Sequence, residues 1–167
     1  MVNFILKAII NILGIGSNVL RIPLTQRSKF EGWLKVMLAY TLSSRYKNVG
    51  IEYPYPRNNK IHADVFANHS YIELKTPNTN YIVNNVPQKK RPITNNITSI
   101  IQDINKLRTQ ANGYDGYIAF VLFPINDNQN YASHINRVDK AIGNPKQISS
   151  KIITINNISV LVYVAKV

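Results

Sequence analysis

The sequence predicts an α/β domain with a mixed central β-sheet flanked by helices and a β-hairpin at its C-terminus. Residues 61–76 alternate apolar and polar side chains with the period of two that is typical of strands. Residues 28–42, 94–108 and 131–142 instead repeat apolar side chains at helical spacing. The apolar run at 116–123 is typical of a buried strand, and it follows a helix, which favours a crossover between parallel strands.

The balance of charge indicates the kind of partner. The chain has 167 residues, enough for one domain with a sizeable core. Its 20 Lys and Arg against 8 Asp and Glu give a formal net charge of +12. This excess favours an anionic partner, with nucleic acid ahead of a membrane surface. The absence of cysteine excludes disulfides, zinc-thiolate sites and cysteine nucleophiles, and the three histidines lack a zinc-ligand spacing.

The first 16 residues are the most apolar stretch of the chain. Lys7 and Asn11 interrupt the stretch, and it is too short to span a bilayer. A signal peptide is the alternative, although a charged start and a clear cleavage site are both missing. We expect a helix that ends near Gly14 and Gly16 and packs on the core or in a homodimer contact. A cytoplasmic protein without stable membrane association is the corresponding expectation.

Glu31 has two interpretations. It lies in the predicted helix 28–42, on the edge of an apolar stripe that includes Trp33 and Leu38, where its carboxylate could reach the sheet. Ser28 precedes it by three residues, however, and this spacing is that of a capping box, in which the glutamate closes its own helix end. Both interpretations stay open at this point.

Three strands are predicted next, at 49–55 and on both sides of a turn at 67–70. Asn68 is among the residues that favour this turn. Pro54 and Pro56 end the first strand and favour an edge position, because proline cannot donate a hydrogen bond to a neighbouring strand.

The hairpin brings two acidic residues together. If Phe66 pairs with Tyr71 across the turn, Asp64 lies opposite Glu73 on the same face. Lys75 follows two residues farther along that face. Like charges placed directly opposite each other are destabilising, so we expect a divalent cation between the two carboxylates. The alternative is an exposed hairpin face with a solvated Glu–Lys pair.

Asp64, Glu73 and Lys75 resemble the motif of the PD-(D/E)XK nuclease superfamily. The resemblance implies a restriction-endonuclease-like fold and a Mg²⁺-dependent DNA endonuclease, in which Mn²⁺ can substitute. Asp64 and Glu73 would bind the metal together with the carbonyl of Leu74. Lys75 would orient or deprotonate the attacking water, and Glu31 would complete the site. The same residues would serve a four-way-junction resolvase, while a DNA-binding module without activity would keep the fold and the basic surface.

The resemblance covers residues 28–123, the expected catalytic core. Residues 1–27 would add an N-terminal helical extension, and residues 124–167 a C-terminal helix and hairpin, to a single nuclease domain. Ala63 stands where the proline of the motif's name would be, and that proline is often absent in the family.

Residues 76–96 are polar and lack clear periodicity. A loop this long in a compact domain is usually functional or disordered, and its position after Lys75 favours contact with DNA. The alternative is a flexible solvated loop. The expected contacts are from Lys89, Lys90 and Arg91 to phosphates and from Asn80 and Tyr81 to bases.

The C-terminal part completes the predicted sheet. Thr94 or Asn96 is expected to cap the helix 94–108. Residues 151–167 predict a hairpin around Asn156-Asn157, because asparagine tolerates the positive φ of such turns. The second strand of this hairpin is nearly all apolar, so we expect burial on both faces, and a dimer interface is one place for it.

Overall fold

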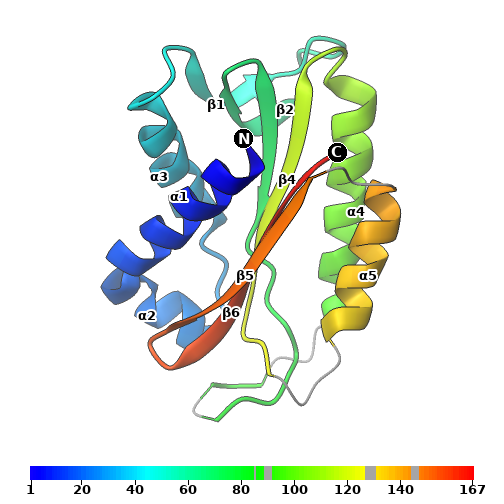
Figure 1. Cartoon of the computed structure of the whole chain (residues 1–167). Coiled ribbons are helices and arrows are strands. Elements are labelled where there is room, and N and C mark those ends of the chain that lie inside the picture. The colour runs from blue at the N-terminus through cyan, green and yellow to red at the C-terminus, as the bar shows by residue number, and fades with distance from the viewer. Residues whose placement is uncertain (85, 89–91, 127–130, 144–146) are drawn as a thin grey trace.

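A six-stranded mixed β-sheet lies between two layers of helices (Figure 1). The computed structural model describes residues 1–84, 86–88, 92–126, 131–143 and 147–167. The elements, in chain order, are α1 (Val2–Ile15), α2 (Ser17–Gln26), α3 (Glu31–Ser43), β1 (Val49–Pro54), β2 (His62–Ala67), β3 (Ser70–Lys75), α4 (Ile93–Gln110), β4 (Asp115–Leu122), α5 (Tyr131–Ile142), β5 (Ile148–Ile155) and β6 (Ile158–Lys166).

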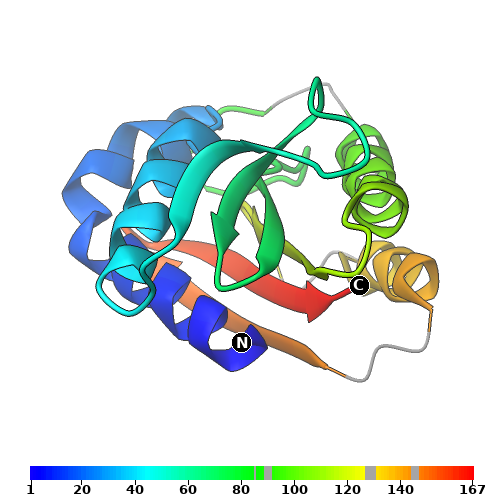
Figure 2. The ribbon, with the colours of Figure 1, turned by 90° about the horizontal axis from the view of Figure 1, so that it is seen from above.

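The strand order is β1-β2-β3-β4-β6-β5, so β1 and β5 form the edges of the sheet. β3 and β4 pair in parallel through the crossover helix α4, whereas the other neighbouring strands are antiparallel. The predicted mixed sheet, the edge position of the first strand and the parallel crossover are therefore confirmed. Figure 2 shows the same sheet from above, with α4 and α5 on one side and α1 to α3 on the other.

The sheet divides the core in two because side chains alternate between its faces. Val65, Ile72 and Leu74 pack towards α1 and α3, whereas Tyr71 and Ile118 pack towards α4 and α5. β4 and β6 lie inside the sheet and are buried on both faces, which explains their apolar sequences. β6 is covered by β4, β5 and the helices of its own chain, so its burial requires no dimer interface.

The N-terminal helix α1 packs on the sheet, which confirms the expectation that it packs on the core. Its residues Ile5, Ile9 and Leu13 are fully buried. α2 was not predicted; it follows after a bend of 91° at Gly16, where an added Cβ would lie 2.5 Å from the ring of Trp33. Among the described residues, no single helix is both long enough and apolar enough to cross a membrane. α1 and α2 meet these two criteria only when they are taken together across the bend.

Arg27 holds the segment after β3 against the core. Its buried guanidinium donates hydrogen bonds to the carbonyls of Thr79 and Tyr81, both at 2.5 Å. The amide of Asn78 in turn donates to the Arg27 carbonyl at 2.9 Å. The first part of the predicted DNA loop is therefore structural, because Arg27 pairs with its backbone.

Candidate functional site

The hairpin β2–β3 pairs only near its turn. Asn68 and His69 form the turn with φ of 51° and 57°, and Phe66 pairs with Tyr71 as predicted. The last registered pair is Val65 with Ile72. Beyond it the two strands separate, and we call this open end of the hairpin the fork.

At the fork, a side chain replaces the partner strand. The Oδ2 atom of Asp64 accepts a hydrogen bond from the backbone N–H of Leu74 at 2.8 Å. The expectation that Asp64 pairs across the strands with Glu73 is therefore wrong. The Asp64 carboxylate instead accepts the hydrogen bond of the Leu74 N–H, a backbone donor that β2 does not pair with after the strands separate. The outcome still brings Asp64 to the same end of β3 as Glu73 and Lys75.

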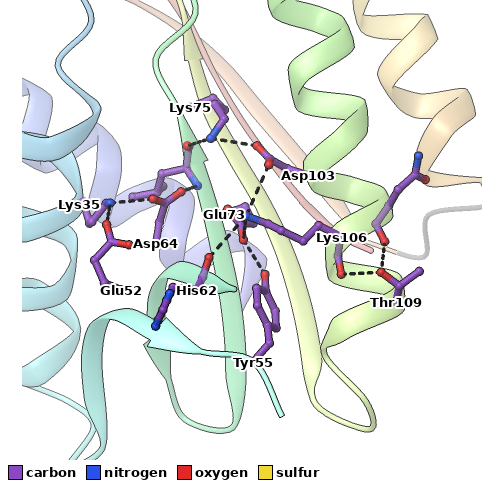
Figure 3. Close-up of polar contacts among 12 residues, drawn as sticks. Lys35, Glu52, Tyr55, His62, Asp64, Glu73, Lys75, Asp103, Lys106 and Thr109 are labelled. Atoms are coloured by element: carbon purple, nitrogen blue, oxygen red, sulfur yellow. Dashed lines mark hydrogen bonds and ion pairs between the residues drawn. The ribbon is translucent and has the colours of Figure 1, made fainter. Parts of the chain in front are cut away.

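A cluster of charged side chains surrounds the fork (Figure 3). It contains five of the chain's eight acidic residues and three lysines. When all are ionised, five carboxylates and three ammonium groups leave a formal charge of −2 within a chain of charge +12. The members of this fork cluster are Glu31, Lys35, Glu52, Asp64, Glu73, Lys75, Asp103 and Lys106.

Lys75 connects the two helical layers. Its Nζ atom lies 3.0 Å from Oδ2 of Asp103 on α4 and 3.6 Å from Oε1 of Glu31 on α3. These helices cover opposite faces of the sheet, so side chains from both faces meet where β2 and β3 separate. The capping-box interpretation of Glu31 is wrong, because α3 begins at Glu31 after Phe30, without a side-chain cap. Glu31 belongs to the fork cluster.

Lys35 of α3 joins two further acids. Its Nζ atom lies 2.8 Å from Oδ1 of Asp64 and also contacts Oε1 of Glu52. Glu52 has a φ of 47°, a left-handed conformation that is uncommon for a non-glycine residue and strained within a strand. The Glu52 side chain is 61% exposed, so it forms part of the solvent-facing rim of the fork cluster.

Glu73 forms the floor of the cluster, with a side chain only 1% exposed. Its Oε1 atom lies 2.7 Å from the ammonium of Lys106 and accepts a hydrogen bond of 2.6 Å from the hydroxyl of Tyr55. Burial raises the pKa of Glu73 to about 7, although Lys106 and Tyr55 act in the opposite direction. Nearby Asp64 adds a smaller upward contribution to this pKa.

The same cluster keeps Lys75 protonated. Burial by itself would lower the pKa of Lys75, but Asp103 and Glu31 outweigh it and raise that pKa above its usual value. An ammonium that holds its proton this firmly cannot deprotonate a water molecule. Of the two roles expected for Lys75, orienting the water is the one that agrees with the raised pKa.

The three expected metal ligands each hold an ammonium group in this structure. Asp64 pairs with Lys35 at 2.8 Å and Glu73 with Lys106 at 2.7 Å, while the carbonyl of Leu74 accepts a hydrogen bond from Lys75 at 3.2 Å. Across the described ranges, no three His, Asp or Glu side chains are arranged as a ready metal site. Two carboxylates and a carbonyl nevertheless fit Mg²⁺, a hard cation that completes its shell with water and phosphate oxygens.

Five residues near the fork were not predicted as site residues: Lys35, Glu52, Tyr55, Asp103 and Lys106. Lys35 follows Glu31 by four residues, which places both on one side of α3. Asp103 and Lys106 are separated by three residues on the helix that directly follows Lys75. These spacings were the available signal, but the helical spacing of the apolar residues leaves Asp103 outside the predicted buried stripe of its helix. Instead it is 9% exposed and points to Lys75.

The expected DNA contacts at 76–96 are only partly described. Tyr81 is 8% exposed and packs in the core beside α4, so its ring cannot reach a base, and this prediction is wrong. Asn80 is half-buried, and its Oδ1 atom accepts a hydrogen bond of 3.4 Å from the backbone N–H of Ile93. Asn80 therefore takes the place of the Thr94 or Asn96 cap expected for α4. Lys89, Lys90 and Arg91 lie outside the described residues.

No family model, curated protein or solved structure matches this chain. The resemblance to the PD-(D/E)XK superfamily therefore depends on the motif residues and on their positions in the fold.

Proposed function

We propose that the protein is a metal-dependent DNA endonuclease of the PD-(D/E)XK type, which hydrolyses phosphodiester bonds. One observation carries the proposal: Asp64, Glu73 and Lys75 belong to one cluster of charged side chains at the open end of a hairpin in the mixed sheet. The concentration of acidic residues at this one place, in a strongly basic chain, supports a site for a cation beside an anionic substrate.

In this proposal the acidic groups bind the metal ion and the lysine contacts the water and the phosphate. Asp64, Glu73 and the carbonyl of Leu74 would hold Mg²⁺, with Mn²⁺ as a substitute. The ion would neutralise charge on the scissile phosphate and lower the pKa of a bound water. Lys75, held as an ammonium by Asp103 and Glu31, would orient the nucleophile and stabilise negative charge on the phosphate.

Lys35 and Lys106 have a second role in this proposal. In the structure their ammonium groups neutralise the two carboxylates that would bind the metal. A side chain of Lys is long and flexible, so each can leave its carboxylate and pair with a substrate phosphate instead. The fork cluster would thus exchange lysine–carboxylate pairs for lysine–phosphate pairs when substrate binds.

A DNA-binding module without activity is the alternative. It is favoured by the observation that a lysine ammonium group already contacts each of the three groups that would bind the metal. Supercoiled plasmid incubated with the protein and Mg²⁺, with and without a chelator, separates the two. An endonuclease nicks the plasmid only without chelator, and Asp64→Asn and Glu73→Gln abolish nicking while DNA binding remains. A binding module binds the plasmid and never nicks it.

The choice of DNA structure is tested in the same assay. A four-way junction and a linear duplex of the same sequence are offered in competition. Preferential cleavage of the junction would assign the protein as a resolvase, whereas equal cleavage would assign a general endonuclease.

A further inference from the structure

A pocket at the closed end of the β2–β3 hairpin combines aromatic faces with positive charge. It has a volume of about 460 Å³ and lies between the loop from α3 to β1 and the hairpin turn. Arg45 and Lys47 supply the charge, and five rings supply the aromatic part of its lining: Tyr46, Tyr53, Phe66, His69 and Tyr114. In the described chain no carboxylate lines this pocket.

Two of these rings, those of Tyr53 and Tyr114, are stacked on a neighbour and yet open to solvent. Tyr53 stacks on Phe66 with centroids 4.2 Å apart and an interplanar angle of 12°. His69 stacks on Tyr114 at 6.0 Å and 23°. Tyr53 is nevertheless 39% exposed and Tyr114 40% exposed, so both present a free surface to the pocket while their neighbours hold them in place.

Gly50 keeps Tyr53 in this position. A Cβ atom at Gly50 would lie 2.8 Å from Cδ2 of Tyr53, so the absence of a side chain allows the ring to lie against the backbone of β1. Tyr71 supports the arrangement from below, 5.0 Å from the ring of Phe66 and 5.3 Å from that of Tyr114. A preformed aromatic surface of this kind loses little conformational freedom when a flat ligand stacks on it.

From these features we propose that the pocket binds an unpaired nucleotide of a DNA strand. A base would stack on Tyr53 and Tyr114, and the adjacent phosphates would pair with Arg45 and Lys47. Asn48 and Asn68, which also line the pocket, offer amide groups to the base edge. A duplex keeps its bases stacked inside the helix, so this combination selects an unpaired base.

The pocket lies next to the fork. Phe66 precedes the turn by two residues and follows Asp64 by two, which is about 7 Å along β2. Tyr71 and Glu73 have the same separation on β3. A base in the pocket would therefore place a phosphate of the same strand near Asp64 and Glu73. Assigning this strand to the substrate rests on the proposed function, whereas binding of the base does not.

The test is a binding experiment in the presence of chelator, so that no cleavage interferes. The probe is a short single-stranded oligonucleotide with one 2-aminopurine, whose fluorescence falls when the base stacks. We expect the parent chain to quench the probe. The double variant Tyr53→Ala/Tyr114→Ala should lose the quenching and bind roughly 5- to 50-fold more weakly. Tyr53→Phe/Tyr114→Phe, which keeps the rings, should bind as the parent does.

The matched control is Tyr40→Ala, which removes a tyrosine that is 74% exposed on α3 and does not line the pocket. It should bind as the parent does. Lys47→Gln should weaken binding of every sequence equally and reduce the salt dependence by about one phosphate contact. Thermal unfolding of each variant shows whether the fold is kept.

Three results would overturn the proposal. The first is equal binding by the Tyr53→Ala/Tyr114→Ala and Tyr40→Ala variants. The second is equal binding of a blunt duplex or of the free 2-aminopurine nucleotide, which would indicate a duplex-binding or a nucleotide-binding site. The third is tyrosine-dependent displacement of the oligonucleotide by an acidic peptide. A failure of the plasmid assay would leave this binding result unchanged, so the two proposals fail separately.

Discussion

Two hairpins of this chain share one turn design and differ in how far their strands stay paired. Asn68-His69 and Asn156-Asn157 both adopt positive φ values, between 50° and 63°. β5 and β6 then stay paired from Ile155 and Ile158 to Ile148 and Ala165. β2 and β3 stop pairing after Val65 and Ile72, and the Asp64 side chain takes over a backbone donor.

The difference lies in the residues after the turn. Apolar and small side chains pack along β6 on both faces, so nothing competes with the pairing of backbone to backbone. In β2 and β3 the corresponding positions carry Asp64, Glu73 and Lys75, whose ion-pair partners among the described residues come from α3 and α4. We infer that the β2–β3 hairpin gives up strand pairing to assemble a charged site.

The largest expected effect comes from removing the ammonium group of Lys75, which pairs with Glu31 of α3 and Asp103 of α4. In the proposed endonuclease, Lys75→Met should lower the rate of plasmid nicking roughly 10²- to 10³-fold, because charge stabilisation at the phosphate is lost. Nicking assays under single-turnover conditions measure this change. Lys166→Met is the matched control, since it removes a lysine from an exposed pair with Asp115 and should leave the rate unchanged. Equal loss in both variants would contradict a special role for Lys75.

The buried carboxylate at the fork should make stability depend on pH. The pKa of Glu73 is about 7 in the folded chain against 4.5 for the free side chain, so folding favours the protonated form. This stabilisation is complete below pH 4.5 and is lost as the pH rises to about 7. Over that window the free energy of unfolding of the parent should fall relative to Glu73→Gln, by up to about 3 kcal/mol.

Urea titrations of both proteins across this pH range measure the difference. All other acidic groups are shared, so the difference isolates Glu73. A stability difference that rises with pH would mean that Glu73 is ionised and stabilised by Lys106 throughout, and would contradict the assigned direction of the pKa shift.

Removing the partner of that carboxylate should cost less, because Glu73 can take up a proton. Lys106→Met leaves Glu73 without its 2.7 Å ion pair and should lower the free energy of unfolding by about 2 kcal/mol near pH 8. The loss should shrink in acid, where Glu73 is neutral. Chemical denaturation at both pH values checks this, with Lys166→Met expected to cost less than about 1 kcal/mol at either.

The smallest effect tests whether the two turns are equivalent. Asn68→Gly and Asn157→Gly each replace an asparagine of positive φ, at the first position of one turn (51°) and at the second position of the other (63°). Each should change the free energy of unfolding by less than about 1 kcal/mol, because glycine relieves the left-handed strain but adds entropy to the unfolded chain. A much larger gain from Asn68→Gly would show that strain in the turn, and not the charges beyond it, separates β2 from β3.

Most helices and strands could be predicted from the sequence, because the spacing of apolar residues within a segment indicates its secondary structure. The alternation around Val65 and Ile72 and the asparagine turns were sufficient for both hairpins, and the apolar run of β4 for its central position. α2 was missed because only Leu20 and Leu24 are buried, while the apolar residues Val19 and Ile22 are exposed and Pro23 lies inside the helix.

The candidate site was predictable only in part, since its partners come from elements far apart in the sequence. The strand pattern could place Asp64, Glu73 and Lys75 at the same end of the β2–β3 hairpin, whereas the loss of pairing between the strands and the partners Lys35 and Lys106 could not be predicted from it. Tyr81 looked like a surface residue because its segment is polar. Its burial depends on the guanidinium of Arg27, which is 52 residues away from the Thr79 carbonyl that it binds.

A calorimetric titration with Mn²⁺ in the absence of DNA would show whether the fork binds a cation. We expect the parent to bind the ion and Asp64→Asn/Glu73→Gln to lose it, while Asp115→Asn, altered at an acid outside the fork, binds as the parent does. Equal binding by the parent and the Asp64→Asn/Glu73→Gln variant would contradict a cation site where β2 and β3 separate.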